Sequence, residues 1–119
     1  MSDTKQAVVV ARYGGALELM ERPIPHPAPD EVLLKVRASG LCSTDLLLLQ
    51  GRMLLGDLPR IVGHETAGEI VELGAPVRDW RIGDRAIVAM DVVCGKCRHC
   101  LTGETQRCTA MKRIGFERD

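Results

Sequence analysis

Four of the chain's five cysteines lie in the stretch DVVCGKCRHCLTGETQRC, which spans residues 91–108. Their spacing is C-x2-C-x2-C-x7-C, and thiolates three residues apart can converge on one small ion when the backbone loops around it. Gly95 and Gly103 permit the tight turns that such a loop needs. Zinc favours four soft ligands in a tetrahedron, at about 2.3 Å from each sulfur. The sequence therefore predicts a zinc site held by Cys94, Cys97, Cys100 and Cys108.

Two disulfide bonds are the competing interpretation of this cysteine cluster. Residues three apart would close small, strained rings, and an odd total of five cysteines fits complete pairing poorly. His99 lies inside the cluster and is a conceivable ligand, but four cysteines already fill a tetrahedral site, so we expect His99 to face solvent. A site closed by four thiolates has no open position for a substrate. Its predicted role is therefore structural.

Composition excludes several classes of function. The chain has 119 residues, enough for one domain with a modest core, and 16 basic residues balance 16 acidic ones. No basic stripe indicates nucleic acid or an anionic membrane as a partner. The apolar runs are too short to cross a bilayer, and the N-terminus lacks the apolar segment of a signal peptide. We therefore expect a cytoplasmic protein, where reduced thiols favour metal binding over disulfides.

The elements that must position these residues are mostly strands. Residues 6–12 and 16–21 predict a hairpin, with its turn at 13–15. Alternate prolines over residues 22–31 predict an extended surface connection. Three further strands are predicted at 30–39, where Val32, Leu34 and Val36 would share a face, at 69–73 and at 85–89. Many short strands with glycine and proline turns are typical of a barrel-like, mainly β domain.

One short helix interrupts the strands. Ser43 can cap a helix that runs through residues 44–50 and ends at Gly51. The four leucines at 46–49 either belong to the core or line an apolar substrate pocket, and we favour the core for most of them.

A second group of residues could also do chemistry. It consists of Gly40-Leu41-Cys42-Ser43-Thr44-Asp45 and Gly63-His64-Glu65. An isolated cysteine is commonly a small buried hydrophobe, and a lone histidine is more often an ordinary polar residue than a ligand. Residue types and spacing alone therefore leave a metal site here as only one of the interpretations.

Read in order, the chain resembles the N-terminal part of the zinc-dependent alcohol dehydrogenases of the medium-chain dehydrogenase/reductase superfamily. The resemblance covers essentially the whole chain. It implies a mainly β fold, a GroES-like and partly open β-barrel with short helices and a four-cysteine zinc lobe at about residues 91–110. It rests on G-L-C-x-T-D at 40–45, G-H-E-x-A-G at 63–68, G-D-R at 83–85 and the four cysteines.

The resemblance also implies a role for each residue of the second group. Cys42 and His64 would bind the catalytic zinc, with Glu65 as an alternative or neighbouring ligand. Asp45 would accept the other N–H of His64 and fix its tautomer. The Thr44 hydroxyl would receive the proton that leaves the substrate alcohol. The cysteines of the lobe match the structural zinc site of the family.

The implied function is zinc-assisted hydride transfer between an alcohol or polyol and NAD(P)+. In the family, the nucleotide-binding Rossmann domain and the third protein ligand of the catalytic zinc lie beyond the position of residue 119. We therefore expect residues 1–119 to form a GroES-like catalytic-domain fragment. It should have no nucleotide-binding residues of its own and no activity alone, and a homo-oligomer is an option for the full-length enzyme only.

Two departures from the family pattern bear on the chemistry. Leu47 stands where many relatives carry a histidine that completes a proton relay, and Ser43 stands where several carry a basic residue for the cofactor pyrophosphate. The alternative function is a non-catalytic, structural zinc-binding module that acts through protein contacts. A zinc ribbon that binds nucleic acid is disfavoured by the zero net charge and by the presence of only three aromatic residues.

Overall fold

The computed structural model describes residues 3–53 and 56–118, and in these residues the chain is mainly β-structure. None of the described helices has the length and apolar character that a bilayer crossing requires. The elements run in the order β1 (Thr4–Val10), β2 (Leu17–Pro23), β3 (Val32–Gly40), α1 (Ser43–Leu49), β4 (Arg60–Ile61), β5 (Glu65–Leu73), β6 (Arg85–Ile87), β7 (Asp91–Val92), α2 (Arg98–Leu101), the 3-10 helix η1 (Thr105–Arg107) and β8 (Lys112–Arg113).

The first sheet contains the predicted hairpin. Its strand order is β2-β1-β4, and all neighbours are antiparallel. Thr4 pairs with Pro23 at one end of the hairpin and Val10 pairs with Leu17 at the other. The turn between them contains Gly14 at a φ of 68°, a left-handed conformation that glycine adopts without a steric penalty. The hairpin prediction is therefore confirmed.

The second sheet, with the order β3-β5-β6, carries the residues of the candidate site. The pairing of β3 with β5 is antiparallel and irregular, with register shifts between Leu33 and Leu34 and between Val36 and Ala38. Gly68 lies beside these shifts, and a Cβ there would overlap the carbonyl oxygen of Lys35. Only glycine allows the strands to approach so closely at this point.

The core is small and lies mainly under β1 and β5. Its buried apolar members are Ala7, Val9, Val10, Leu48, Ile70, Cys108 and Phe116. On β3, Val32 and Leu34 are half-buried, whereas Val36 is 57% exposed, so the face that these residues were predicted to share is covered over only part of its length.

The leucines of α1 are not all core residues. Leu48 is buried, whereas Leu46 is 46% exposed. Leu47 and Leu49 are half-buried, so three of the four leucines face inward at least in part and Leu46 is the exception. A short helix has one buried face, so four consecutive leucines cannot all point inward.

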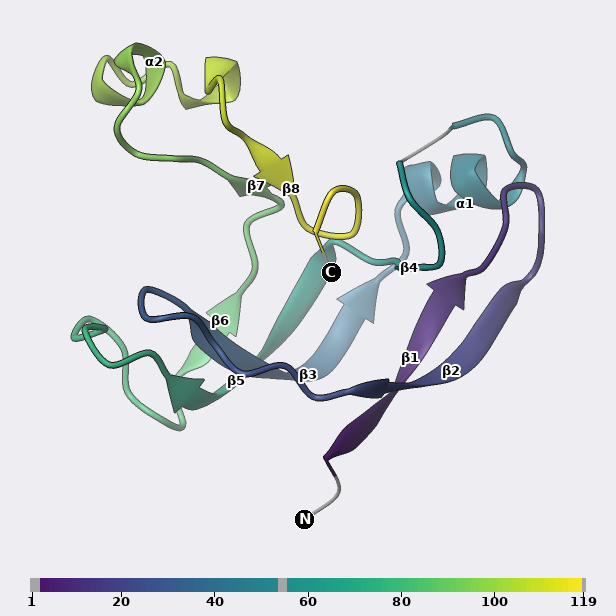
Figure 1. The fold of residues 1–119 in the computed structure, drawn as a ribbon, viewed down its shortest axis with the longest axis horizontal. Coiled ribbons are helices and arrows are strands. Elements are labelled where there is room, and N and C mark those ends of the chain that lie inside the picture. The colour runs from purple at the N-terminus through teal and green to yellow at the C-terminus, as the bar shows by residue number, and fades with distance from the viewer. Residues whose placement is uncertain (1–2, 54–55, 119) are drawn as a thin grey trace.

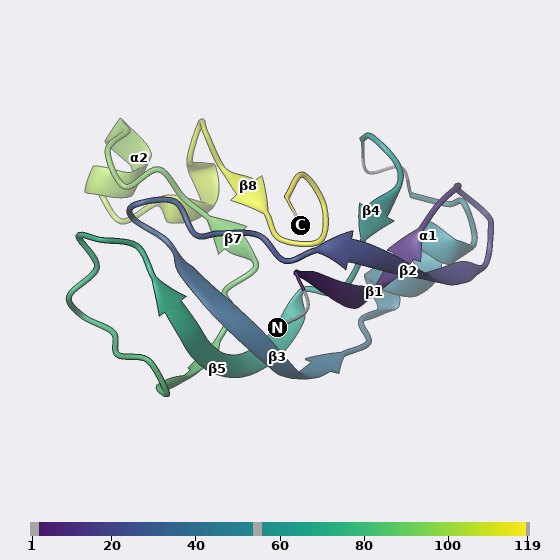
Figure 2. The ribbon, with the colours of Figure 1, turned by 60° about the horizontal axis from the view of Figure 1, so that its bottom comes forward.

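The two three-stranded sheets remain open and do not close on one another, as expected of a partly open barrel (Figure 1). Strands β7 and β8 pair with one another and lead to a small lobe that contains α2 and η1. Figures 1 and 2 both show this lobe on one side of the molecule and α1 on the other. The described chain is flat, with principal extents of 41 × 41 × 21 Å.

Candidate metal centres

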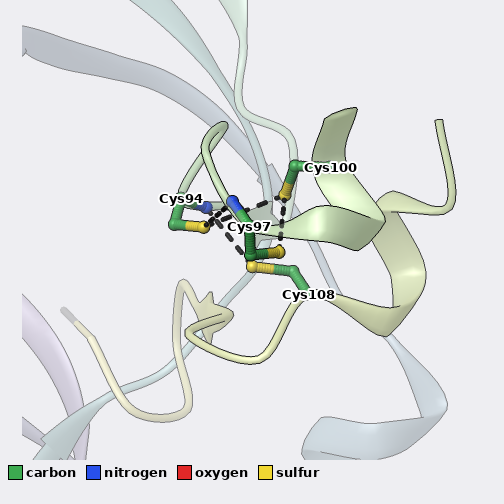
Figure 3. Close-up of side chains that lie close together, drawn as sticks. All are labelled: Cys94, Cys97, Cys100 and Cys108. Carbon is green, nitrogen blue, oxygen red and sulfur yellow. Dashed lines mark hydrogen bonds between the residues drawn. The ribbon is translucent and has the colours of Figure 1, made fainter. Parts of the chain in front are cut away.

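The four cysteines of the lobe converge on one point. Figure 3 shows their sulfur atoms pointing toward one another, and all four lie within 4.8 Å of each other. The Cys97 and Cys100 sulfurs are 3.5 Å apart, and those of Cys94 and Cys100 are 3.9 Å apart. A disulfide requires about 2.05 Å, whereas a zinc tetrahedron with bonds of about 2.3 Å has edges of about 3.8 Å. All five cysteines of the chain are free thiols, and the lobe has the dimensions of a zinc site.

Backbone N–H groups hold these sulfurs in place. The Cys97 N–H donates to Cys94 Sγ at 3.4 Å, across a turn that contains Gly95 at a φ of 70°. The Cys94 N–H donates to Cys108 Sγ, also at 3.4 Å. Donors aimed at sulfur favour the thiolate form that metals require. The loop therefore organises its ligands from the backbone, as the glycine positions predicted.

The thiols of the lobe differ in proton affinity. Backbone N–H groups of Cys100 and Thr109 lower the pKa of Cys97 to about 5. Burial, together with the neighbouring Cys97, raises the pKa of Cys100 to about 12. Without a metal, thiols this close cannot all ionise, because like charges repel at short range. A bound cation would remove that restriction and release the remaining protons.

His99 contacts an acidic residue of the lobe and is not part of the cysteine cluster. Its Nδ1 lies 3.3 Å from the Glu104 carboxylate, which is also 3.3 Å from the guanidinium of Arg107. The His99 side chain is 24% exposed and belongs to α2, so it faces solvent only in part, and it is not grouped with the four sulfur atoms. Its contact in the lobe is with the Glu104 carboxylate, beside the sulfur cluster.

The second candidate site is built by the pairing of β3 with β5. Gly40 at the end of β3 pairs with Glu65 at the start of β5. The ligand atoms of Cys42, His64 and Glu65 consequently lie within 4.8 Å of one another. A Cβ on Gly40 would overlap the Glu65 carboxylate, so the absence of a side chain there leaves room for that carboxylate to reach the site.

Helix α1 begins beside this cluster and places Cys42 at its N-cap, one residue earlier than the predicted cap Ser43. The reason is Asp45, whose carboxylate accepts the Cys42 backbone N–H at 2.9 Å. At the other end, Gly51 has a φ of 65° and its N–H donates to the Leu48 carbonyl, so the helix ends at the predicted glycine. Cys42 is thereby fixed by the helix start itself.

The side chains around Cys42 stabilise its thiolate. The pKa of Cys42 is lowered to about 7, chiefly by its hydrogen bonds with the backbone N–H and the hydroxyl of Thr44, with a further contribution from His64. The distance from Cys42 Sγ to Thr44 Oγ1 is 3.7 Å. Asp45 and His64 are 5% and 8% exposed. Both are therefore buried, and the predicted hydrogen bond between them stays a prediction.

Sequence reasoning missed Phe116. Its ring lies against the imidazole of His64, with centroids 5.2 Å apart and planes inclined by 49°. Phe116 is buried, although 52 positions separate it from His64 in the chain. Nothing in the local pattern around Phe116 distinguishes it from an ordinary core residue, so only the folded chain reveals this contact.

Comparison with known proteins defines the class. The family model described as the alcohol dehydrogenase GroES-like domain matches residues 28–116. Alcohol dehydrogenase 2 of Caenorhabditis elegans is 37% identical over 117 residues, which are 97% of this chain and 33% of that protein. L-threonine 3-dehydrogenase of Pyrococcus horikoshii is 38% identical over 122 residues, covering 100% of this chain and 35% of that protein.

A solved structure agrees with these sequences. A cobalt- and zinc-bound thermostable alcohol dehydrogenase from Pyrobaculum aerophilum superposes with a TM-score of 0.85 and 33% identity, over 96% of this chain and 36% of that one. The chain therefore belongs to the alcohol dehydrogenase GroES-like domain family, and the predicted fold class is confirmed. It spans about a third of the length of the curated relatives that it matches.

Proposed function

We propose that this chain is the metal-bearing, catalytic-domain portion of a zinc-dependent alcohol or polyol dehydrogenase that uses NAD(P). The observation that carries the proposal is the convergence of Cys42, His64 and Glu65 within 4.8 Å, beside the hydroxyl of Thr44. These residues come from two separate segments of the chain, and the pairing of β3 with β5 brings them together.

The donor sets of the two clusters fit zinc in different ways. Four thiolates form a closed set that suits a structural ion, so Cys94, Cys97, Cys100 and Cys108 would hold one zinc without reacting. A mixed set of one thiolate, one imidazole and one carboxylate is typical of catalytic zinc, in which a position stays open for substrate. Bound there, zinc would supply a Lewis acid that polarises an alcohol or carbonyl oxygen.

The residues around the second cluster have roles that follow from their chemistry. Asp45 orients Cys42 by accepting its N–H, and we infer that it also fixes the tautomer of His64. The Thr44 hydroxyl is within reach of the site and would accept the proton released when an alcohol is oxidised. Leu47 cannot relay that proton, so a water molecule or the ribose of the cofactor would carry it onward.

The cofactor and substrate belong to the larger protein of which this chain would be a part. We infer that residues beyond those in this chain form the NAD(P)-binding domain, because the relatives are about three times as long. The substrate class is a small alcohol or polyol, and we infer a cytoplasmic location, because a zinc site of four thiolates requires cysteines that stay reduced. A purely structural zinc module explains the lobe but not the second cluster.

The test is metal analysis of the purified 119-residue chain beside an assay of NAD(P)+ reduction with simple alcohols, polyols and threonine. We expect about one firmly held zinc per chain, bound by the four cysteines, with the three-ligand cluster taking up further zinc only weakly. We expect no turnover, because the proposed site of the hydride acceptor lies outside residues 1–119. A Cys42→Ser variant should keep that zinc. Sustained turnover by the verified chain would overturn the proposal that the nucleotide site lies elsewhere.

A further inference from the structure

Phe116 contacts His64 in a way that restricts the imidazole. The centroid separation of 5.2 Å and the inclination of 49° fall within the range that attractive aromatic pairs prefer, about 4.5–7 Å with tilted planes. Both side chains are buried, at 9% and 8% exposed. A ring packed against the imidazole removes space into which it could otherwise rotate. The contact therefore limits the direction in which the His64 nitrogens point.

The loop that carries Phe116 is closed on itself and anchored. The Gly115 N–H donates to the Arg118 carbonyl at 2.6 Å, and the Arg113 N–H donates to the Glu117 carboxylate at 2.8 Å. The Arg118 guanidinium forms an ion pair with Glu31, the residue that immediately precedes β3. Phe116 is thus presented by a held loop and not by a free chain end.

Two glycines bring this loop directly against the segment of His64. Gly115 has a φ of 78° and is buried. A Cβ on Gly115 would lie 3.0 Å from the carbonyl oxygen of Gly63 and 3.3 Å from its carbonyl carbon. Gly63 itself has a φ of 104° and immediately precedes His64. A side chain at position 115 would crowd the Gly63 backbone, so Gly115 allows the loop to lie close to the residue that precedes His64.

The same loop continues from the four-cysteine lobe. Ile114 follows β8, and its N–H donates to the Met90 carbonyl at 3.0 Å, just before β7. The Met111 N–H donates to the Cys108 carbonyl at 3.4 Å. A continuous path of backbone contacts therefore runs from a ligand of one cluster to the ring that packs on a ligand of the other.

We propose that Phe116 is a positioning residue for His64, which keeps the imidazole directed toward Cys42 and Glu65. The loop of residues 113–118 sets the position of the ring. The inference rests on the proposed function only for the role of His64 as a metal ligand. The packing of Phe116 on His64 stands on geometry alone, so the two can fail separately.

The experiment compares the zinc-loaded chain with Phe116→Ala, Phe116→Tyr and Phe116→Leu variants. One equivalent of zinc fills the four-cysteine site first, and cobalt(II) is then titrated into the second site and followed by its thiolate-to-metal absorption. We expect Phe116→Ala to weaken cobalt binding about 10-fold, as loss of a residue that orients a ligand does. Phe116→Tyr, which retains the ring, should bind like the original chain.

A second readout does not depend on metal at the second site. Nuclear magnetic resonance of the His64 ring in the zinc-loaded chain should show contacts with Phe116 and shifts from its ring current. In Phe116→Ala the His64 ring signals should move toward those of an unrestrained histidine. Trp80→Ala is the matched control, because Trp80 is 43% exposed in the loop at the far end of β5 from His64.

Each outcome decides a different point. Unchanged cobalt affinity and unchanged His64 signals in Phe116→Ala would overturn the positioning role. If the original chain binds no cobalt beyond its zinc, the ligand role of His64 fails, and the His64 signals still test the packing. If Phe116→Ala loses the amide signals of the β3–β5 pair, that variant has not folded, and Phe116→Leu takes its place in testing the positioning role. That variant keeps an apolar side chain without a ring, and cobalt affinity equal to that of the original chain would contradict the proposal.

Discussion

At the residue scale, Cys42 differs from an ordinary half-buried cysteine because several hydrogen-bonding groups surround its sulfur. The backbone N–H of Thr44, its hydroxyl and the side chain of His64 all lower the pKa of the Cys42 thiol, and burial only partly opposes them. A thiolate is the form in which cysteine binds metals and reacts with electrophiles. The start of α1 thus lowers the pKa of Cys42 and favours the thiolate form in the metal-free chain.

This environment predicts a specific pH dependence. In the reduced, metal-free chain, the rate of Cys42 alkylation should rise with pH through a midpoint near 7, because the lowered pKa keeps the thiolate present at lower pH. Thr44→Val should move the midpoint upward by removing the hydroxyl donor, and Ser43→Ala should move it less, because Ser43 makes the smallest contribution. Site-resolved mass spectrometry measures these rates. A midpoint near the ordinary cysteine value of about 8.5 in the original chain would contradict the account.

Asp45 carries a second prediction at this scale. Its buried carboxylate accepts the N–H of Cys42, so Asp45→Ala leaves that N–H without its partner at the start of α1. Hydrogen bonds to charged groups contribute about 1.5–3 kcal/mol, and we expect a loss of that size in the free energy of unfolding. Urea denaturation measures the loss, with Asp79→Ala at an exposed position as the control. Equal stabilities of the two variants would show that Asp45 does not hold the helix start.

For Asp45→Asn, the family resemblance gives a sharper expectation in the full-length enzyme. Zinc affinity or activity should fall roughly 10- to 100-fold if the carboxylate orients His64. The amide keeps the shape of the side chain, so stability should change less than in Asp45→Ala. A full-length Asp45→Asn enzyme with unchanged zinc affinity and activity would rule out the orienting role.

At the element scale, the two clusters depend on different structures. The four-cysteine site is formed by one loop between β7 and β8, and its sulfurs are held by local backbone N–H groups. The second site requires β3 and β5 to pair in register, so that Gly40 faces Glu65. The four-cysteine site should therefore depend only on its own loop, whereas the second site forms only when β3 and β5 have paired.

Cys100→Ser tests this separation. The variant should lose about one zinc per chain, and amide hydrogen exchange should accelerate over residues 91–110. The β3–β5 pair should keep its protection, because it has its own buried side chains such as Ile70. Cys42→Ser is the matched control and should retain the zinc of the lobe. Full zinc retention in Cys100→Ser, or disulfide bonds at these positions under reducing conditions, would refute the assignment of the lobe.

At the scale of the whole molecule, the sequence predicted the features that are local and missed those that depend on distant segments. The hairpin, the end of α1 at Gly51 and the cysteine loop each follow from turn residues or spacing within a few positions. The exposure of Val36 could not be predicted, because the alternation along a strand indicates which residues share a face but not what covers that face.

The candidate site shows the same division. Cys42 and His64 were proposed on a resemblance, since an isolated cysteine and histidine carry no signal of their own. The packing of Phe116 on His64 was missed, because it requires a loop that follows the lobe to return to β5. The N-cap is Cys42 and not Ser43, because the Asp45 carboxylate accepts the N–H of Cys42. The residue preferences of N-caps favour serine and could not predict this choice.

The central claim is that this molecule holds two metal centres of different chemistry, one closed by four thiolates and one of mixed ligands. X-ray absorption at the zinc edge tests it most directly, with the purified chain measured at one and then two equivalents of zinc. With one equivalent, the spectrum should fit four sulfur neighbours at about 2.3 Å. The second equivalent, bound more weakly, should add nitrogen or oxygen neighbours at about 2.0–2.2 Å together with one sulfur. Nitrogen or oxygen neighbours at the first equivalent, or a second equivalent that shows only solvent oxygen, would contradict the account.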